Sequence, residues 1–184
     1  MPDTNRTLIV GPANVGKTTE TARALERWLE TRGSDGVVVL DFAPEVERDG
    51  RVLGGRLDRV TTVPDTVWSG VLDAHAPRSE GADDEAALAL ARDNAARARS
   101  LLDEAPADPT AVFVNDATIP FQADGAIEPL RRYCASATLV VANAFESDEL
   151  GTQNPVSQHE RAALEAFRTW ADRVVELDEP HGRD

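Results

Sequence analysis

The sequence has 184 residues, enough for one domain with a core of its own. Its 33 acidic and 19 basic residues give a formal net charge of -14, which argues against nucleic acid or an anionic membrane as a partner, because both require a positive field. The single cysteine, Cys134, excludes an internal disulfide, and the lack of a signal peptide or a long apolar run predicts a cytoplasmic protein.

The first predicted elements alternate between strand and helix. Apolar runs predict strands at 6–10 and 37–40, the second buried on both faces, and a helix with one apolar face is expected at 17–31. This alternation predicts an α/β fold of three layers, with a doubly wound, mainly parallel sheet and the first strand at its centre.

A phosphate-binding sequence lies between the first strand and the first helix. The pattern G-x-x-x-x-G-K-[ST] is matched at every fixed position by the segment Gly11, Pro12, Ala13, Asn14, Val15, Gly16, Lys17, Thr18 and Thr19. The glycines allow successive N–H groups to face one concavity, and the helix N-terminus adds partial positive charge. Lys17, the only lysine of the chain, is expected on the β- and γ-phosphates, and the Thr18 hydroxyl on Mg²⁺. The planar fork of an arginine does not replace that ammonium.

The whole chain, 1–184, is expected to form a single domain with a lid or substrate-binding insertion at about 43–80. Asp-Gly at 49–50, between short alternating runs, predicts a hairpin there. Arg56 and Arg78 lie in this insertion, and each is either solvated or a group that reaches a transferring phosphate.

The remaining elements follow in order along the chain. We expect a short strand that ends at Val63, a short helix capped by Asp65 that runs through Leu72, and a loop at 75–81. The later predictions are helices at 84–104 and 127–135, strands at 111–114, 138–141 and 174–177, and a last helix that begins with a capping box at Ser157–Glu160.

The acid of the magnesium site is expected at the end of an apolar strand, where ligands bind in open α/β sheets. Asp116 is favoured over Asp41, which alternatively caps a helix or a turn. The pair Asn115-Asp116 leaves two assignments open: Asp116 holds Mg²⁺ and no base follows, or Asn115 takes that place and Asp116 orients water. Asn143, after the strand at 138–141, either contacts a nucleotide base or belongs to a turn.

In the segment GPANVGKT the chain resembles the P-loop NTPase superfamily. This resemblance implies ATP or GTP and Mg²⁺ as cofactors. The C-terminal third, from LVVAN to ADRVVEL, resembles the nucleotide-dependent cobinamide kinases. Three functions follow as hypotheses: phosphoryl or nucleotidyl transfer to a small-molecule acceptor, an NTPase that changes shape for a protein partner, and nucleotide binding with little turnover.

Composition adds an expectation about environment rather than chemistry. Excess acid, arginine in place of lysine and abundant alanine are typical of cytosolic proteins from salt-loving archaea, and concentrated salt screens repulsion within roughly a few ångströms. An acidic protein from a GC-rich genome has the same pattern.

Overall fold

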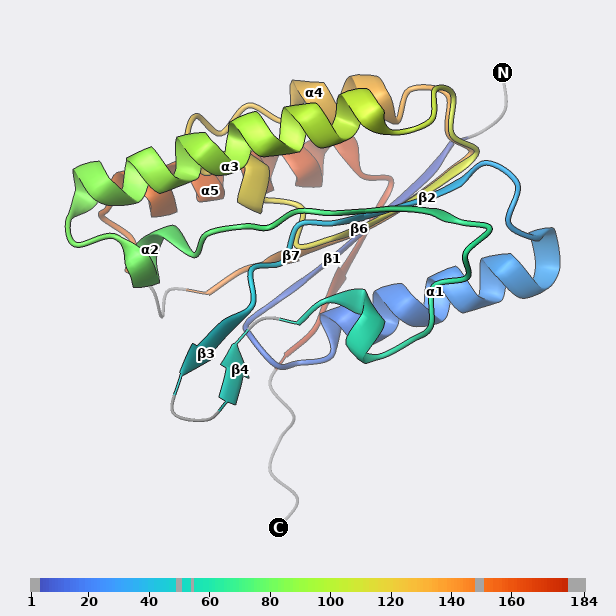
Figure 1. Ribbon diagram of the computed structural model, residues 1–184, viewed down its shortest axis with the longest axis horizontal. Helices are drawn as coiled ribbons and strands as arrows, with labels where there is room; N and C mark the ends of the chain where they lie inside the picture. Colours follow the sequence, from blue (N-terminus) through green and yellow to red (C-terminus); the bar gives the residue numbers. More distant parts are fainter. Residues whose placement is uncertain (1–3, 49–50, 54, 148–150, 179–184) are drawn as a thin grey trace, which may run out of the picture.

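The computed structural model describes residues 4–48, 51–53, 55–147 and 151–178. One sheet of six strands, in the order β5-β2-β6-β7-β1-β8, forms the middle of the molecule, and every neighbouring pair is parallel (Figure 1). Its strands are β1 (Asn5–Gly11), β2 (Val37–Asp41), β5 (Trp68–Val71), β6 (Ala111–Asn115), β7 (Leu139–Phe145) and β8 (Arg173–Glu176).

Helices cover both faces of this sheet, as the alternation of elements predicted (Figure 1). One face carries α2 (Pro77–Glu80), α3 (Asp84–Glu104), α4 (Glu128–Tyr133), α5 (Pro155–Trp170) and the short 3-10 turn η2 (Ile119–Phe121). The other face carries α1 (Lys17–Arg32) and the 3-10 turn η1 (Leu57–Arg59). The α/β class is thereby confirmed. The first strand, however, lies between β7 and the edge strand β8 rather than at the centre.

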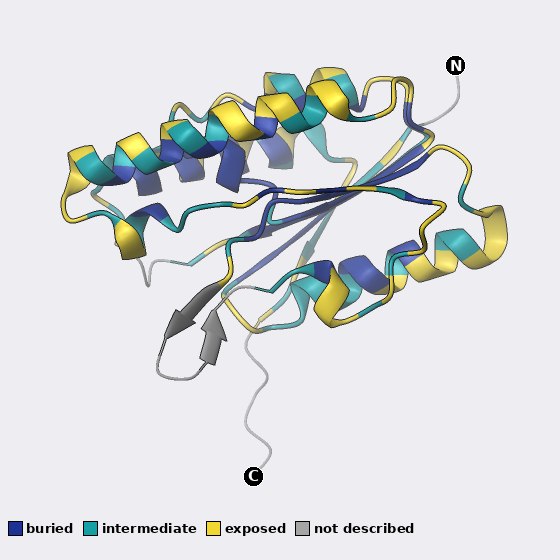
Figure 2. Cartoon of the chain, viewed as in Figure 1, coloured by how far each residue is buried: buried dark blue, intermediate teal, exposed yellow. Residues whose placement is uncertain are grey.

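The uniformly apolar runs explain the core. Every residue of β2 and β6 is buried, as a parallel sheet covered on both faces requires, and Figure 2 shows the inner strands of the sheet as mostly buried. Alternate side chains of each strand point to opposite faces. Val38 and Val112 therefore join the core beneath α3 and α5, whereas Val39 and Phe113 join the core beside α1.

The predicted hairpin forms outside the main sheet. Strands β3 (Val46–Arg48) and β4 (Arg51–Leu53) pair antiparallel as a separate two-stranded sheet, and the predicted turn at 49–50 lies outside the described residues. The hairpin projects from the edge of the main sheet at which β2 ends (Figure 1).

Two predictions between the hairpin and the long helix are wrong. No strand ends at Val63: η1 occupies Leu57–Arg59 instead. The helix expected from Asp65 to Leu72 is β5, which extends the main sheet beside β2. A β-carbon at Gly70 would lie 2.6 Å from the Trp68 ring, so the indole folds over the glycine and buries it. This packing outweighs the local signal for a helix cap.

Two other boundaries differ from prediction. Part of the expected loop at 75–81 is the short helix α2. The last helix begins at Pro155 rather than at Ser157, because the Asn154 side chain accepts a hydrogen bond from the Ser157 amide at 2.8 Å and proline suits the first helical position. Glu160 is therefore an inward-facing helical residue and belongs to no capping box.

Candidate functional site

The two fixed glycines of loop 11–18 are required for different reasons. A β-carbon on Gly11 would lie 2.4 Å from the carbonyl oxygen of Leu177, so the close approach of the chain after β8 requires a residue without a side chain. Gly16 has room around it but adopts a left-handed conformation, φ 98°, at the cap of α1. Asn14 is also left-handed, φ 62°, and the loop therefore curls back over the end of the sheet.

The N-terminus of α1 opens onto this loop. No side chain among the described residues caps the helix, and Gly16 contributes its carbonyl oxygen to the amide of Glu20 at 2.9 Å. The first N–H groups of a helix need an external acceptor, and an anion in the concavity satisfies that need.

Lys17 begins α1 at the rim of the loop. Its Nζ donates to the carbonyl oxygen of Pro12 and lies 6.0 Å from the centre of the Phe145 ring. Burial lowers the pKa of the ammonium, and the charge of Asp116 opposes that shift. The side chain is thus a partly desolvated cation at the mouth of a helix, an unfavourable arrangement until an anion binds beside it.

Three strands of the sheet contribute side chains, at or near their carboxyl ends, to a buried network beside Thr18. Asp41, Asn115 and Asn143 belong to β2, β6 and β7, and each is at most 3% exposed. Because carboxyl ends of parallel strands share one edge of a sheet, residues distant in sequence meet there. The Thr18 hydroxyl donates to Oδ1 of Asn115 at 3.2 Å.

Asn143 connects this network to α1. Its Nδ2 donates to the hydroxyl of Thr21 and to Oδ1 of Asn115, both at 2.8 Å, and its Oδ1 accepts from the amide of Asp116 at 2.9 Å. Both polar atoms of the amide are used within the protein. The structure therefore places Asn143 as a buried connector rather than as an exposed turn residue.

Asp41 holds the segment that follows β2. Its Oδ2 accepts from the amide of Leu57 at 2.7 Å, and its Oδ1 accepts from Nδ2 of Asn115 at 2.9 Å and from the amide of Ala43 at 3.3 Å. Burial raises the pKa of this carboxyl, and the three hydrogen bonds oppose the shift. The carboxylate thus has donors on both sides, from the base of the hairpin segment and from β6.

Asp116 has the most perturbed carboxyl group of the site. Its backbone is left-handed, φ 58°, and its Oδ1 is buried without a hydrogen-bond partner among the described residues. Burial and the nearby charge of Glu160 raise its pKa to about 7, although Lys17 opposes the shift. A carboxyl group with this pKa can either hold or accept a proton near neutral pH.

Arg78 lies in an ion pair rather than in solvent. Its Nη1 is 2.8 Å from Oε1 of Glu160 and donates to the hydroxyl of Ser157 at 2.9 Å, and its guanidinium lies 5.9 Å from the centre of the Phe145 ring. Lys17 approaches the same ring. The pair therefore attaches α2 to α5 close to loop 11–18.

Glu160 extends this ion pair toward Asp116. Its Oε2 accepts from the hydroxyl of Thr118 at 3.1 Å and from Nε2 of Gln122 at 2.7 Å. The segment that follows Asp116 is thereby held against α5. Sequence reasoning missed this role. The signal that could have found it is Asn154-Pro155, which moves the N-cap from Ser157 to Asn154, three residues earlier, so that Glu160 lies beyond the first turn and faces inward.

The remaining predicted residues are more peripheral. Arg56 has a buried Nε without a hydrogen-bond partner in the described part of the chain, and its charge lowers the pKa of Asp41. Cys134 is 1% exposed and packs as a small core residue, with its thiol pKa raised by burial to about 12.

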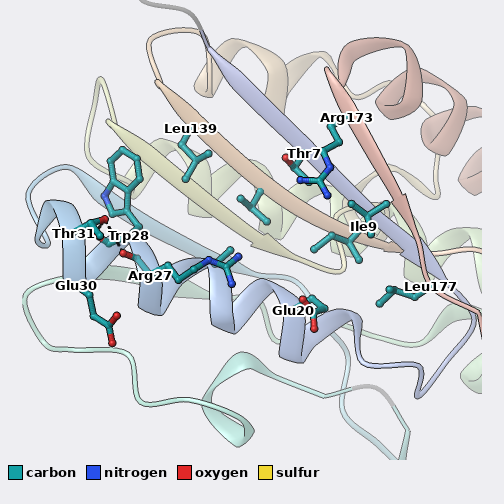
Figure 3. Close-up of a pocket in the computed structure, with 13 residues that line it drawn as sticks. Thr7, Ile9, Glu20, Arg27, Trp28, Glu30, Thr31, Leu139, Arg173 and Leu177 are labelled. Atoms are coloured by element: carbon teal, nitrogen blue, oxygen red, sulfur yellow. Dashed lines mark hydrogen bonds between the residues drawn. The ribbon is translucent and has the colours of Figure 1, made fainter. Parts of the chain in front are cut away.

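A groove of about 440 Å³ lies on the α1 face of the sheet, apart from this network (Figure 3). Side chains of α1, β1, β7 and β8 line it, and Trp28 and Leu139 lie together at one end. Neither Lys17 nor Thr18 is among its lining residues.

The fold and the site together define an α/β protein with an all-parallel sheet, a glycine-bounded loop at its carboxyl edge, and a buried amide–carboxylate network beside that loop. No protein-family model matches the chain, and no curated protein matches its sequence. In the part of the chain that the structure describes, no helix has the length and apolar character needed to cross a membrane.

Proposed function

We propose that loop 11–18 binds a nucleoside triphosphate, ATP or GTP, with Mg²⁺, and that the protein transfers the terminal phosphoryl group to a small-molecule acceptor or hydrolyses it slowly. The observation that carries this proposal is the environment of Lys17. The only lysine of the chain lies partly desolvated at an uncapped helix N-terminus, where its charge opposes the helix dipole. A bound triphosphate compensates both the ammonium and the free N–H groups of the helix.

The residues beside Thr18 suit Mg²⁺. No group of three or more His, Cys, Asp or Glu side chains that could hold a metal alone occurs among the described residues. Nucleotide-bound Mg²⁺ needs fewer protein ligands, because phosphate and water oxygens complete its octahedron. The Thr18 hydroxyl would hold the ion, with Asp41 and Asn115 behind it. When bound, Mg²⁺ neutralises charge on the β- and γ-phosphates.

Lys17 and Asp116 have different roles in the transfer of the phosphoryl group. Lys17 orients the γ-phosphate and stabilises its charge. Asp116 accepts the proton of the attacking hydroxyl, from the acceptor or from water, as the new oxygen–phosphorus bond forms and the bond to the β-phosphate oxygen breaks. A pKa near 7 suits this role. The contact of Asn115 with Thr18 supports the assignment in which Asn115 takes the place beside the Mg²⁺ and Asp116 acts on the attacking hydroxyl.

The test is nucleotide titration of wild type, Lys17→Ala and Lys17→Arg at matched ionic strength, since salt weakens phosphate binding. We expect Lys17→Ala to bind triphosphate roughly a hundredfold more weakly, because two charge-assisted hydrogen bonds are lost, without a lower melting temperature. Lys17→Arg retains part of the affinity and loses transfer.

Arg23→Ala, which removes an exposed cation from the same helix, is the matched control and should bind as wild type does. Equal affinity in all four proteins would contradict the proposal.

A second function, a nucleotide switch that acts on a protein partner, is supported by the β3–β4 hairpin. The base of this hairpin is attached to the site, since Gly55 accepts a hydrogen bond from Asn115 at 2.8 Å and Leu57 donates one to Asp41. Turnover stimulated by a metabolite extract favours the transferase, whereas turnover stimulated only by a protein fraction favours the switch.

A further inference from the structure

The side-chain amide of Asn115 uses all of its hydrogen-bonding capacity. An amide offers two donors and two acceptor positions. Here Oδ1 accepts from Thr18 at 3.2 Å and from Asn143 at 2.8 Å, while Nδ2 donates to Oδ1 of Asp41 at 2.9 Å and to the carbonyl of Gly55 at 2.8 Å. An unbroken line of hydrogen bonds thus runs from the carboxylate of Asp41 through one amide to the hydroxyl of Thr18.

The neighbours of Asn115 explain why this position holds an amide rather than a carboxylate. An aspartate here would face Oδ1 of Asp41 at about the present 2.9 Å separation and the carbonyl of Gly55 at 2.8 Å. Two buried carboxylates at that distance do not both ionise. With asparagine at 115, the negative charge remains on Asp41, one side chain further from the loop.

We propose that Asp41 and Asn115 act as one unit toward Mg²⁺, in which Asp41 supplies the negative charge and Asn115 transmits it to Thr18. The carboxylate polarises the amide, the amide oxygen becomes a stronger acceptor, and the Thr18 oxygen becomes a better ligand, since hydrogen bonds in a chain strengthen one another. Asp41 is a positioning residue in this unit. The inference rests on the proposed nucleotide site.

A purely structural role for Asp41 predicts something different. Its bonds to the amides of Ala43 and Leu57 fix the segment that follows β2, and a variant without them could weaken nucleotide binding by loosening that segment. The loss would then be equal with and without Mg²⁺. It would also persist when a carboxylate is supplied at another position.

The experiment measures the affinity of the full chain for a fluorescent ATP analogue in EDTA and in excess MgCl₂, at one ionic strength. The ratio of the two affinities is the Mg²⁺ gain. We compare wild type, Asp41→Asn, the exchange variant Asp41→Asn/Asn115→Asp, and Glu45→Gln. The last removes one charge from the same segment, together with its ion pair to Arg59, and has no contact with Asn115.

We expect the Mg²⁺ gain of Asp41→Asn to be at least roughly tenfold smaller than that of wild type, because one charge near a divalent ion is removed. Its affinity in EDTA should equal that of wild type. The exchange variant recovers most of the gain, since its carboxylate lies next to Thr18, although the bonds of Asp41 to Leu57 and Ala43 are not restored. Glu45→Gln behaves as wild type.

A gain in Asp41→Asn equal to that of wild type overturns the inference, and so does an exchange variant that folds but recovers none of it. Thermal melts check the fold of each variant, and if Asp41→Asn does not fold, the exchange variant alone decides in the same way. A wild-type chain that binds the analogue in neither condition overturns the proposed function and this inference with it. Binding in both conditions without a dependence on Asp41 overturns the inference alone.

Discussion

Two regions meet at Thr18, and they are built differently. Loop 11–18 consists of consecutive residues, mostly partly exposed, and its shape is set by backbone constraints at Gly11 and Gly16. The network of Asp41, Asn115 and Asn143 is buried, and its members are up to 102 residues apart in sequence, from 41 to 143. It is held by side-chain hydrogen bonds.

The loop and the network are therefore encoded differently in the sequence. The loop depends on local residue types, so a short motif identifies it. The network depends on strand order: β7 lies between β6 and β1, and this arrangement brings the amide of Asn143 to both Asn115 and α1. Substitutions of the loop glycines should therefore act through the backbone, whereas those in the network should act through lost side-chain partners.

The largest effect on stability is expected from Gly11→Ala. Its new β-carbon would lie 2.4 Å from the Leu177 carbonyl oxygen, and this clash with backbone should lower the free energy of unfolding by about 3 kcal/mol. Gly16→Ala should lose only about 1 kcal/mol, the cost of a left-handed alanine with free space around it.

Urea titrations of both variants measure the difference, with the midpoint expected to fall and the slope to stay constant. If Gly16→Ala were the more damaging variant, the distinction between close approach and backbone conformation would be wrong.

A smaller effect is expected in the network. Asn143→Ala removes hydrogen bonds to Thr21, Asn115 and the amide of Asp116 and should lower the free energy of unfolding by about 2 kcal/mol, because buried partners remain unsatisfied. Nucleotide affinity in Mg²⁺ should also fall severalfold, since Asn115 loses one of the groups that orient it.

Asn94→Ala is the matched control for this prediction. Asn94 is equally buried and bonds both backbone groups of His75, with no hydrogen bond to the network. Its loss should lower stability by a similar amount and leave nucleotide affinity unchanged. An equal loss of affinity in both variants would show that general destabilisation, rather than the network, controls binding.

The contrast between local and long-range constraints also explains which strands could be predicted from the sequence. The apolar runs at 37–40, 111–114 and 138–141 identified three strands that lie side by side, because a strand covered on both faces excludes polar residues. The edge strand β5 has one buried residue among four, too few to produce a period, and it was missed.

The sequence could offer Asn115 beside Thr18 only as one of two alternatives, for a different reason. Their contact requires the order of the strands and the left-handed turn at Asp116, and neither is determined by residues nearby in the chain. The same holds for the ion pair of Arg78 with Glu160, which joins two helices through residues 82 positions apart in the sequence.

The last predicted effect, smaller than that of Asn143→Ala, concerns pH and the carboxyl group of Asp116. Its pKa is raised from 3.8 to about 7 in the folded protein, so the unfolded chain binds fewer protons between these values and the free energy of unfolding falls as pH rises. Between pH 6 and pH 8 the titration of this one group should lower the free energy of unfolding by about 1.4 kcal/mol.

The control variant Asp116→Asn keeps the shape of the side chain without its titration, so its free energy of unfolding should change less between pH 6 and pH 8. Urea titrations at pH 6 and pH 8 measure both proteins, and parallel changes in the two would mean that Asp116 is already ionised at pH 6, despite its buried Oδ1.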